Sequence, residues 1–308
     1  MVSIKGDLPE ATENLKGLMS AQDKTKLNNI DGNIIKFAEE GDTITDDGIY
    51  LIVPSVVKIR VSGNSVTLGG APENYTYTDN NYWIKFKNNV YQGRVDWGDG
   101  SLSQVNGQTA NLSHTYTDNV NIHEIIIENV IALGKYFCTD ENVISIYVPK
   151  NVTDIKDSCF EGCGMSSIEL PNTITELSDD TFTDCENLES INIPNSVTSI
   201  SGAFKNCTSL TTIVIPSSVT ELVWSAFAGC TGLTSVTIPA SVVDFYGYVF
   251  NDCDLITEYQ LYWVEDIITY DEDNMPANND TVFVIPQGTT DDYIDANYPS
   301  DKLFERGQ

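Results

Sequence analysis

The sequence is poor in histidine and in basic residues. Two histidines serve the whole chain of 308 residues, so a histidine-based catalytic triad or a histidine-rich metal site is hard to build. Lysine and arginine together number 16 against 45 aspartate and glutamate residues, and the net charge is −29 at pH 7. Because phosphate contacts need clustered lysine and arginine, we expect no binding of nucleic acid or of an anionic membrane surface.

Long apolar runs are also missing. No run reaches the roughly 18 apolar residues that a membrane-spanning helix needs, so we expect no membrane insertion. Residues 1–9 contain no apolar core and no small-residue cleavage site, so we expect no secretory signal. Hydrophobic residues still make up 41% of the chain, which is enough for packed cores. The composition predicts a structural or binding protein with no catalytic residue, no cofactor and no metal.

A repeat of 22 or 23 residues occupies much of the second half of the chain. In each unit a proline ends a short apolar strand, a phenylalanine follows, and a cysteine comes three residues after the phenylalanine. One such unit is too small to bury its own apolar face, so the units are expected to stack into a solenoid of parallel strands. The recurring positions are Pro149, Pro171, Pro194, Pro216 and Pro239; Phe160, Phe182, Phe204, Phe227 and Phe250; and Cys163, Cys185, Cys207, Cys230 and Cys253.

The units at residues 143–257 resemble leucine-rich repeats of the bacterial surface protein A (BspA) type. The resemblance implies a right-handed solenoid that serves adhesion or recognition and has no chemistry of its own. Phe137 lies at the repeat spacing before Pro149, so residues 131–142 are interpreted as a degenerate starting half-repeat. Residues 258–308 resemble the closing segment of such arrays, which implies a last strand and a short helix that starts near Thr290.

The seven cysteines are interpreted as free, buried, apolar thiols. Five of them occupy one repeat position and should form an inward ladder. A disulfide framework and a zinc site are the alternatives. The first would show paired spacings in a short chain, and the second would show Cys-x-x-Cys pairs.

Residues 41–130 are predicted to be antiparallel β-structure, with turns at Gly63-Asn64 and Asn88-Asn89 and a tight turn at Gly98 and Gly100. Trp97-Gly-Asp-Gly100 and His114-Thr-Tyr116 resemble the signature of the polycystic-kidney-disease (PKD) type β-sandwich. This resemblance covers about fifty residues and implies a truncated or fused domain that leads directly into the solenoid. It also implies a structural role for the motif residues.

Catalysis and calcium binding are the alternative roles of the motif residues Asp96, Asp99 and His114. Catalysis is disfavoured because no nucleophile with an orienting group accompanies them. Calcium binding at Asp96 and Asp99, or in the acidic loop 271–280, is disfavoured because a hard cation needs six or more oxygen ligands.

The N-terminal segment points to a virion. Leu18, Met19, Leu27 and Ile30 form the apolar side of a short predicted helix that needs a partner, because short isolated helices are marginal. The string at residues 17–27 is similar to strings in phage tail and fibre proteins. We therefore predict that residues 1–40 attach to other virion proteins and that the protein lies on a phage particle exposed after lysis. By analogy with fibres it would be a homo-oligomer, with a trimer favoured. The alternatives are a bacterial cell-surface adhesin and an enzyme.

Two sets of side chains are candidates for contact with a host surface protein or glycan. On the strand face, outward positions are occupied by Tyr147, Glu169, Asn192, Val214 and Thr237. Elsewhere, Trp224, Tyr246 and Tyr248 stand where other repeats carry serine or aspartate, and exposed aromatic residues are typical interface anchors. The alternative for these three is packing on the C-terminal cap.

Taken together, the sequence predicts a mainly β protein in four parts. They are an N-terminal anchor segment at residues 1–40, a truncated antiparallel PKD-like β domain at 41–130, leucine-rich repeats with parallel strands at 131–257, and a C-terminal strand–helix cap at 258–308.

Overall fold

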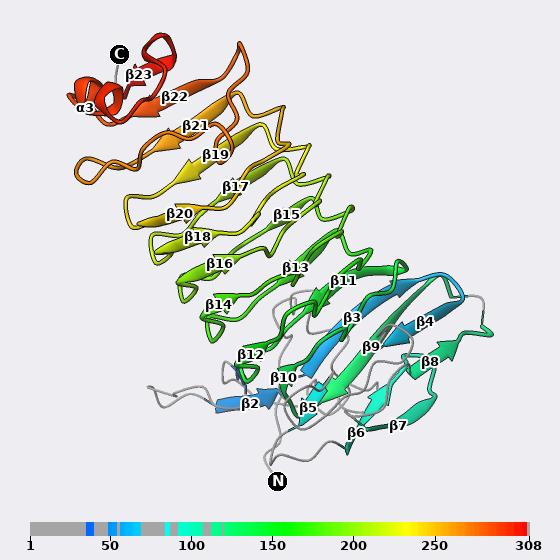
Figure 1. Ribbon diagram of the computed structural model, residues 1–308. Coiled ribbons are helices and arrows are strands. Elements are labelled where there is room, and N and C mark those ends of the chain that lie inside the picture. Colours follow the sequence, from blue (N-terminus) through cyan, green and yellow to red (C-terminus); the bar gives the residue numbers. More distant parts are fainter. Residues whose placement is uncertain are drawn as a thin grey trace. The chain divides into compact units, whose positions relative to one another are not determined.

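The computed structural model describes residues 35–39, 49–53, 56–68, 84–86, 92–106, 112–118 and 120–306. The chain divides into two compact units, Met1–Ser55 and Val56–Gln308. The regular secondary structure of the described residues is mainly strand, as predicted, with one α-helix, α3 (Thr290–Asp295), and a 3-10 turn at Ser300–Lys302 (Figure 1). In this part of the chain no helix is long and apolar enough to cross a membrane.

The first unit contains two paired strands, β1 (Ile35–Glu39) and β2 (Ile49–Val53). They run parallel, with Ile35 opposite Ile49, so the antiparallel prediction is wrong for β2. The reason lies in the composition of β2, because an uninterrupted apolar run is typical of parallel strands. Leu18, Met19, Leu27, Ile30 and the predicted helix around them lie outside the described residues.

The antiparallel strands of the second unit precede the repeats. β3 pairs with β9 along its whole length, β9 also pairs with β6, β6 and β7 form a hairpin, and β4 pairs with β8. The strands are β3 (Val56–Ser62), β4 (Ser65–Leu68), β5 (Ile84–Phe86), β6 (Gln92–Asp96), β7 (Leu102–Asn106), β8 (Leu112–Thr115) and β9 (Ile122–Glu128).

The hairpin predicted around Asn88-Asn89 is wrong. β5 pairs with β10 (Val130–Leu133) of the repeats, whereas β6 pairs with β7 and β9, so the two predicted arms lie in different sheets. The turn after β3 likewise leads β4 to β8 and not back onto β3. Alternating side chains show which face of a strand is buried, but they do not specify the strand beside it.

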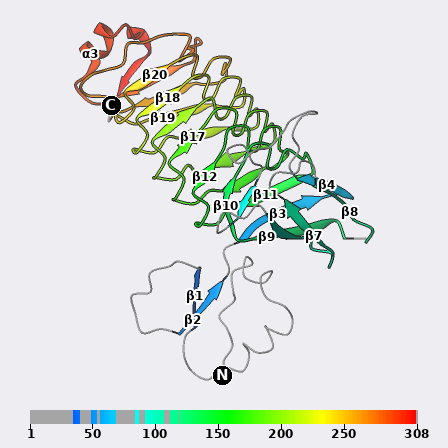
Figure 2. The same cartoon turned by 60° about the horizontal axis from the view of Figure 1, so that its bottom comes forward.

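The repeats form two rows of parallel strands, one on each side of the solenoid, which we call ladders (Figures 1 and 2). Strand pairing is interrupted between β15 and β17 in the first ladder and between β12 and β14 in the second. The first ladder consists of β11 (Val143–Tyr147), β13 (Ser167–Glu169), β15 (Ser190–Ile191), β17 (Thr212–Val214), β19 (Ser235–Ile238), β21 (Glu258–Leu261), β22 (Val282–Ile285) and β23 (Leu303–Glu305). The second ladder consists of β10 (Val130–Leu133), β12 (Asp154–Ile155), β14 (Glu176–Leu177), β16 (Ser199–Ser201), β18 (Glu221–Val223) and β20 (Asp244–Tyr246).

The antiparallel strands and the first repeat strand share one sheet. β3 lies between β9 and β11 and is antiparallel to both, within the order β15-β13-β11-β3-β9-β6-β7. The preceding β-structure therefore leads directly into the solenoid. Phe137 is fully buried and its ring meets that of Phe160 edge-on at 6.1 Å, as expected for a starting half-repeat.

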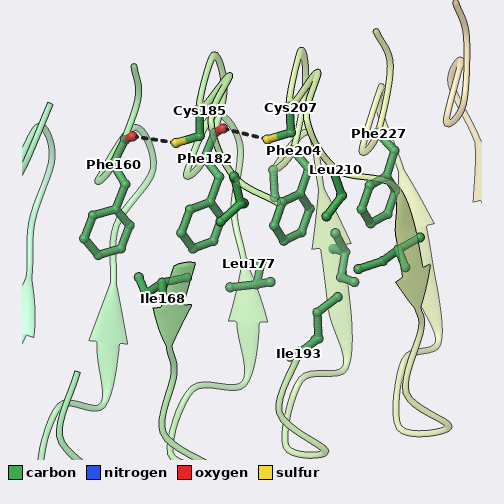
Figure 3. Packing of buried hydrophobic residues seen from close by; sticks show 14 of the residues in the cluster. Phe160, Ile168, Leu177, Phe182, Cys185, Ile193, Phe204, Cys207, Leu210 and Phe227 are labelled. Atoms are coloured by element: carbon green, nitrogen blue, oxygen red, sulfur yellow. Dashed lines mark hydrogen bonds between the residues drawn. The ribbon is translucent and has the colours of Figure 1, made fainter. Parts of the chain in front are cut away.

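A column of phenylalanine rings runs through the core between the ladders (Figure 3). Centroids of successive rings from Phe160 to Phe250 are 5.0 to 5.4 Å apart, and the rings are nearly parallel. Beside this column, four cysteines donate to the carbonyl oxygen of the phenylalanine one turn earlier, for example Cys207 Sγ to Phe182 at 3.2 Å; the other three are Cys185, Cys230 and Cys253. All seven cysteines are free and buried, which confirms the sequence interpretation.

The residue before each ladder cysteine adopts a left-handed backbone conformation. Its φ lies between +58° and +73°, and the residue is glycine, aspartate or asparagine in every turn, the types that tolerate this conformation. At Gly229 a Cβ would also lie 2.2 Å from Asn206 Oδ1 of the preceding turn. The five positions are Gly162, Asp184, Asn206, Gly229 and Asp252.

The C-terminal segment closes the stack, and α3 starts at Thr290, as predicted. Trp263 Nε1 donates to the carbonyl oxygen of Val242 at 2.9 Å, and Tyr293 Oη of α3 donates to that of Trp263 at 3.0 Å. Figure 2 shows α3 at the end of the solenoid opposite β3 and β9. The last turn therefore has its buried carbonyl groups covered by aromatic side chains.

The buried thiols should be chemically silent in the folded protein. Burial raises the pKa of the Cys159, Cys185 and Cys253 thiols well above the ordinary value, and the thiolate is the reactive species. We expect none of the seven to react with Ellman's reagent at pH 8, and all seven to react in guanidinium chloride. An exposed cysteine introduced by Ser190→Cys serves as the positive control. Rapid reaction of any native thiol would contradict the buried ladder.

Candidate binding surfaces

The residues of the two sequence motifs, Trp97–Gly100 and His114–Tyr116, meet at the β6–β7 hairpin. Trp97 N donates to Ser101 O at 3.2 Å, and Gly98 and Gly100 have φ of +85° and +90°, which confirms the predicted glycine turn. At Gly98 a Cβ would lie 2.6 Å from the carbonyl oxygen of Glu124 on β9, so glycine is required for space as well as for conformation.

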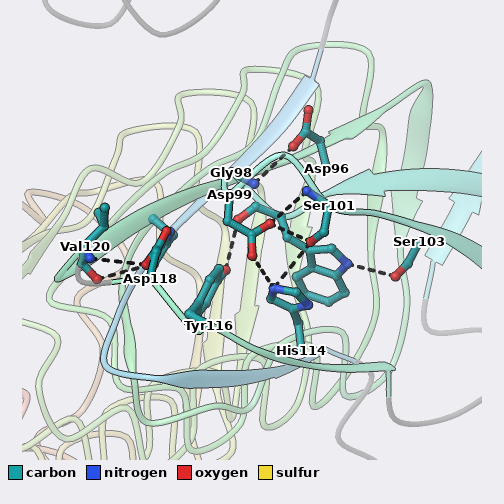
Figure 4. A network of polar contacts seen from close by, with 11 residues as sticks. Asp96, Gly98, Asp99, Ser101, Ser103, His114, Tyr116, Asp118 and Val120 are labelled. Carbon is teal, nitrogen blue, oxygen red and sulfur yellow. Dashed lines mark hydrogen bonds and ion pairs between the residues drawn. The ribbon is translucent and has the colours of Figure 1, made fainter.

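His114 on β8 closes this hairpin (Figure 4). Its Nε2 lies 2.8 Å from Asp99 Oδ2, and Asp99 Oδ1 accepts hydrogen bonds from Ser101 N at 2.9 Å and from Ser101 Oγ at 2.5 Å. The imidazole stacks on the indole of Trp97, with centroids 4.8 Å apart. Tyr116 Oη donates to the Trp97 carbonyl oxygen at 3.1 Å. These contacts join β8 to the hairpin.

Serine, histidine and aspartate are present here, but not in the geometry of a hydrolase triad. In a triad the carboxylate and the hydroxyl bind opposite nitrogens of the imidazole. Here Nε2 of His114 faces both Asp99 at 2.8 Å and Ser101 Oγ at 3.4 Å. Asp96 likewise accepts from Gly98 N at 3.0 Å within the turn. Among the described residues no group of three or more histidine, cysteine or acidic side chains is placed to hold a metal ion.

The turn should lose stability in acid. Hydrogen bonds from Ser101, together with His114, hold the pKa of Asp99 well below its usual range. A carboxyl group whose pKa is lowered on folding stabilises the folded state at pH values above its unfolded-state pKa of about 4. This stabilisation is lost as the pH falls towards the folded-state pKa. We expect Asp99→Asn to lower the unfolding free energy by about 1 kcal/mol at pH 5. The difference from wild type should shrink towards pH 2 in urea titrations, whereas the exposed control Glu272→Gln should show neither effect.

The outward face of the first ladder forms two rows. One row is rich in hydroxyl groups and consists of Ser145, Ser167, Ser190, Thr212 and Ser235. The second row consists of the five candidate contact residues predicted from the sequence. Glu169, Asn192 and Val214 are exposed, and Tyr147 and Thr237 are half-buried. The strand register extends this second row through Gln260, Val284 and Phe304, which sequence reasoning missed because the repeat pattern fades there.

Trp224, Tyr246 and Tyr248 lie together at the end of the second ladder, and we call this group the aromatic corner. The exposed fractions are 59%, 46% and 55%, so these side chains are not buried beneath the C-terminal cap. Trp224 and Tyr246 come from neighbouring turns and meet edge to face, with ring centroids 5.3 Å apart and planes at 85°. Trp224 N donates to Tyr246 O at 3.0 Å. The cap contributes Asn274 Oδ1, which accepts from Tyr248 N at 2.8 Å.

Backbone strain marks the same corner. Trp224, Ser225 and Tyr248 have φ of +54°, +60° and +68°, a conformation that bulky residues rarely adopt. Equivalent turns carry Ser158, Asp180 and Gly202 in the left-handed region, residue types that accommodate it more easily. Outliers of this kind cluster at functional sites, where the surrounding structure holds them in place.

The strain at Tyr248 can be measured. We expect Tyr248→Asn to raise the unfolding free energy by about 1 kcal/mol, because asparagine tolerates the left-handed conformation. Tyr246 belongs to the extended strand β20, so Tyr246→Asn should instead lower it by about 1 kcal/mol through loss of the contact with Trp224. Urea-unfolding midpoints of the two variants should move in opposite directions. Destabilisation by Tyr248→Asn would mean that the tyrosine supports the fold.

Acidic and hydroxyl side chains flank the aromatic corner. Glu221 and Asp244 are exposed and stand opposite each other on β18 and β20. Ser201 Oγ on β16 donates to Asp179 Oδ1 at 2.6 Å, and Ser201 pairs with Val223, the residue before Trp224. Three rings therefore project from a rim of hydrogen-bonding groups.

Stacked turns of 22 or 23 residues with two parallel ladders form a solenoid of the leucine-rich-repeat kind. Residues 113–257 match the family model for the BspA type leucine rich repeat region, in six copies. This part of the chain is therefore similar to BspA-type leucine-rich repeats. The match begins before the predicted start at residue 131, because Ile125, Ile127, Val130, Leu133 and Phe137 already follow the repeat pattern without its proline.

The fold of one solved structure, the first of the three below, is similar at a TM-score above 0.5. The pneumococcal vaccine antigen PcpA has 19% identity and a TM-score of 0.52, over 58% of this chain and 45% of that one. A leucine-rich repeat protein from Bacteroides ovatus has 24% identity and a TM-score of 0.40, over 57% and 46%. One from T. pallidum has 22% identity and a TM-score of 0.43, over 61% and 82%. The alignments with the first two span less than half the length of those proteins. No curated protein sequence matches the chain significantly.

Proposed function

We propose that the protein is a non-enzymatic recognition protein whose repeat domain is displayed at a surface and binds its partner through the aromatic corner. The main support is that three exposed aromatic residues lie on neighbouring turns and that two of them have a left-handed backbone conformation. Aromatic anchors of this kind dominate the binding energy of interfaces.

The solenoid suits this role because it is a rigid support. Each turn is bonded to its neighbours, and the rings of Trp224 and Tyr246 are already in contact before a partner arrives. Little side-chain freedom is then lost on binding, which favours affinity. The outer row of the first ladder, with Tyr147, Glu169, Asn192 and Thr237, supplies a second and more polar surface on the same support.

We place the domain on a bacterial cell surface. The support is the match of residues 113–257 to repeats of the bacterial surface protein A type. On such a surface the strongly acidic composition keeps the repeats solvated and discourages self-association.

A phage particle is the second candidate carrier. It is favoured by the string at residues 17–27, which is similar to strings in phage tail and fibre proteins. In that case Leu18, Met19, Leu27 and Ile30 would dock on other virion proteins, and the protein would be a homo-oligomer, a trimer by analogy with fibres. Mass spectrometry of purified particles and of washed cell envelopes from the same culture separates the two candidates.

Trp224→Ala should abolish attachment. Labelled full-length protein is incubated with a panel of bacterial and epithelial cells, and bound protein is measured by flow cytometry. We expect the wild type to bind at least one cell type and Trp224→Ala to lose about tenfold or more in affinity, as for an interface hot spot. Leu102→Ala is the control, because Leu102 is similarly exposed but lies on β7, outside both ladders.

Circular dichroism and urea unfolding establish that both variants are folded. Undiminished attachment by folded Trp224→Ala would overturn the aromatic corner as the contact site. Absence of attachment by the wild type to every cell type would overturn the proposed function itself.

A further inference from the structure

We propose that the partner at the aromatic corner is a neutral carbohydrate. This inference rests on the proposed function and specifies the ligand. The geometry that points to it is a perpendicular pair of exposed rings bordered by carboxylates and hydroxyl groups. Sugar rings present C–H groups on their faces and hydroxyl groups around their edges. Their binding sites therefore need flat apolar surfaces and a rim of hydrogen-bond acceptors.

The rings supply the flat surfaces. The ring planes of Trp224 and Tyr246 stand at 85° to each other, and the two residues are 59% and 46% exposed, respectively. Aromatic rings of this kind combine apolar area with little conformational entropy to lose. Tyr248, two residues along the chain from Tyr246, adds a third ring that is 55% exposed. Such a corner can accept one sugar face on each wall.

The position of the indole is built into the backbone. At Gly247 a Cβ would lie 3.0 Å from Trp224 N and 3.1 Å from Trp224 Cε3. The indole therefore lies close against the backbone of the next turn, and a side chain at Gly247, whose φ is +87°, would strain the backbone and press on Trp224. The hydrogen bonds from Trp224 N to Tyr246 O and from Ser225 N to Gly247 O fix this turn as well. A platform that is pre-organised in this way favours binding of a rigid ligand.

The rim supplies the acceptors. Glu221 and Asp244 are exposed on neighbouring strands, so their backbones are about 5 Å apart. A carboxylate accepts several hydrogen bonds, and those that it accepts are stronger than those between neutral groups. Adjacent hydroxyl groups of a sugar are the matching donors. Asp179, which already accepts from Ser201 Oγ at 2.6 Å, continues the acidic rim on the other side of Trp224.

The charge selects a neutral carbohydrate. Uronic acids, sulfated sugars and phosphorylated polymers would meet carboxylates on Glu221, Asp244 and Asp179 in a chain of net charge −29. A protein partner fits less well, because a stable protein interface buries about 800 Å² on each side around an apolar centre. At this corner the apolar surface of three rings is interrupted by carboxylates.

Tryptophan fluorescence provides a direct readout. Trp97 and Trp263 are buried, whereas Trp224 is exposed, and Trp83 lies outside the described residues and is removed by Trp83→Phe. The full chain with this substitution is titrated with neutral hexasaccharides of glucose, mannose, galactose and N-acetylglucosamine. Hexasaccharides of galacturonate and hyaluronan are the anionic counterparts. We expect a saturable change in emission with at least one neutral sugar and none with the anionic ones.

Variants then locate the site, with affinity measured by calorimetry so that loss of the fluorophore does not matter. Trp224→Ala and Tyr246→Ala should each weaken binding by about tenfold or more. Asp244→Asn should weaken it less, because the amide still accepts a hydrogen bond. Leu102→Ala, on β7 outside both ladders, should leave it unchanged. Equal binding by Trp224→Ala, or binding of the anionic sugars as tightly as the neutral ones, would overturn the assignment.

Cells that bind the protein distinguish this inference from the proposed function. Periodate, which cleaves vicinal diols of sugars, should abolish attachment, whereas protease treatment should leave it. If protease removes the attachment that depends on Trp224 and periodate does not, the partner is a protein. In that case the recognition function stands and the carbohydrate inference fails. No response to any of the neutral hexasaccharides, together with resistance of attachment to periodate, also overturns it.

Discussion

The hydrogen bonds that join one turn of the solenoid to the next hold the rest of the structure in place. A single turn leaves buried carbonyl groups without partners, and the following turn satisfies them with backbone amides, thiols and hydroxyls. Ser196 Oγ and Ser218 Oγ donate to the carbonyl oxygens of Ile174 and Val197 at 2.6 Å, one turn back. Cys230 Sγ does the same towards Phe204 at 3.0 Å. Because unpaired buried polar groups are costly, each turn is stable only beside its neighbour.

The same requirement explains the two ends of the stack and the aromatic corner. At the C-terminal end Trp263 Nε1, in place of a serine hydroxyl, donates to the carbonyl oxygen of Val242. The carbonyl oxygen of Trp263 in turn accepts a hydrogen bond from Tyr293 of α3. At the other end β3 pairs with β11. Between them the ladder holds the backbone of Trp224 and Ser225 so firmly that both remain left-handed. The cooperative hydrogen bonding of many turns thus supports local strain that an isolated loop would relieve.

The repeats could be predicted from the sequence because their signal is redundant. Proline, phenylalanine and cysteine recur together, and each reports the same register. The first copy was missed because β9 leads into Val130 without a proline. Strand partners such as β5 with β10 could not be predicted, since alternation carries no information about the neighbour. At the candidate site, aromatic residues in place of serine or aspartate predicted exposure. The left-handed backbone of Trp224 was not predicted, because it depends on the turn geometry of the folded ladder.

The insertion of β3 between β9 and β11 has a consequence for the order of assembly. Repeat arrays ordinarily grow by local steps, with each turn adding to the one before it in the chain. Here β9 and β11 are joined in one sheet only through β3, which pairs with both of them. β3 lies about eighty residues before β11 in the chain, and the hydrogen bond from Ser62 N to Asn142 O is one of the contacts between these distant segments. Contacts of long sequence separation are slow to form. Formation of the repeat array therefore depends on pairing with β3. This pairing couples the repeats and the preceding antiparallel strands into one cooperative folding unit.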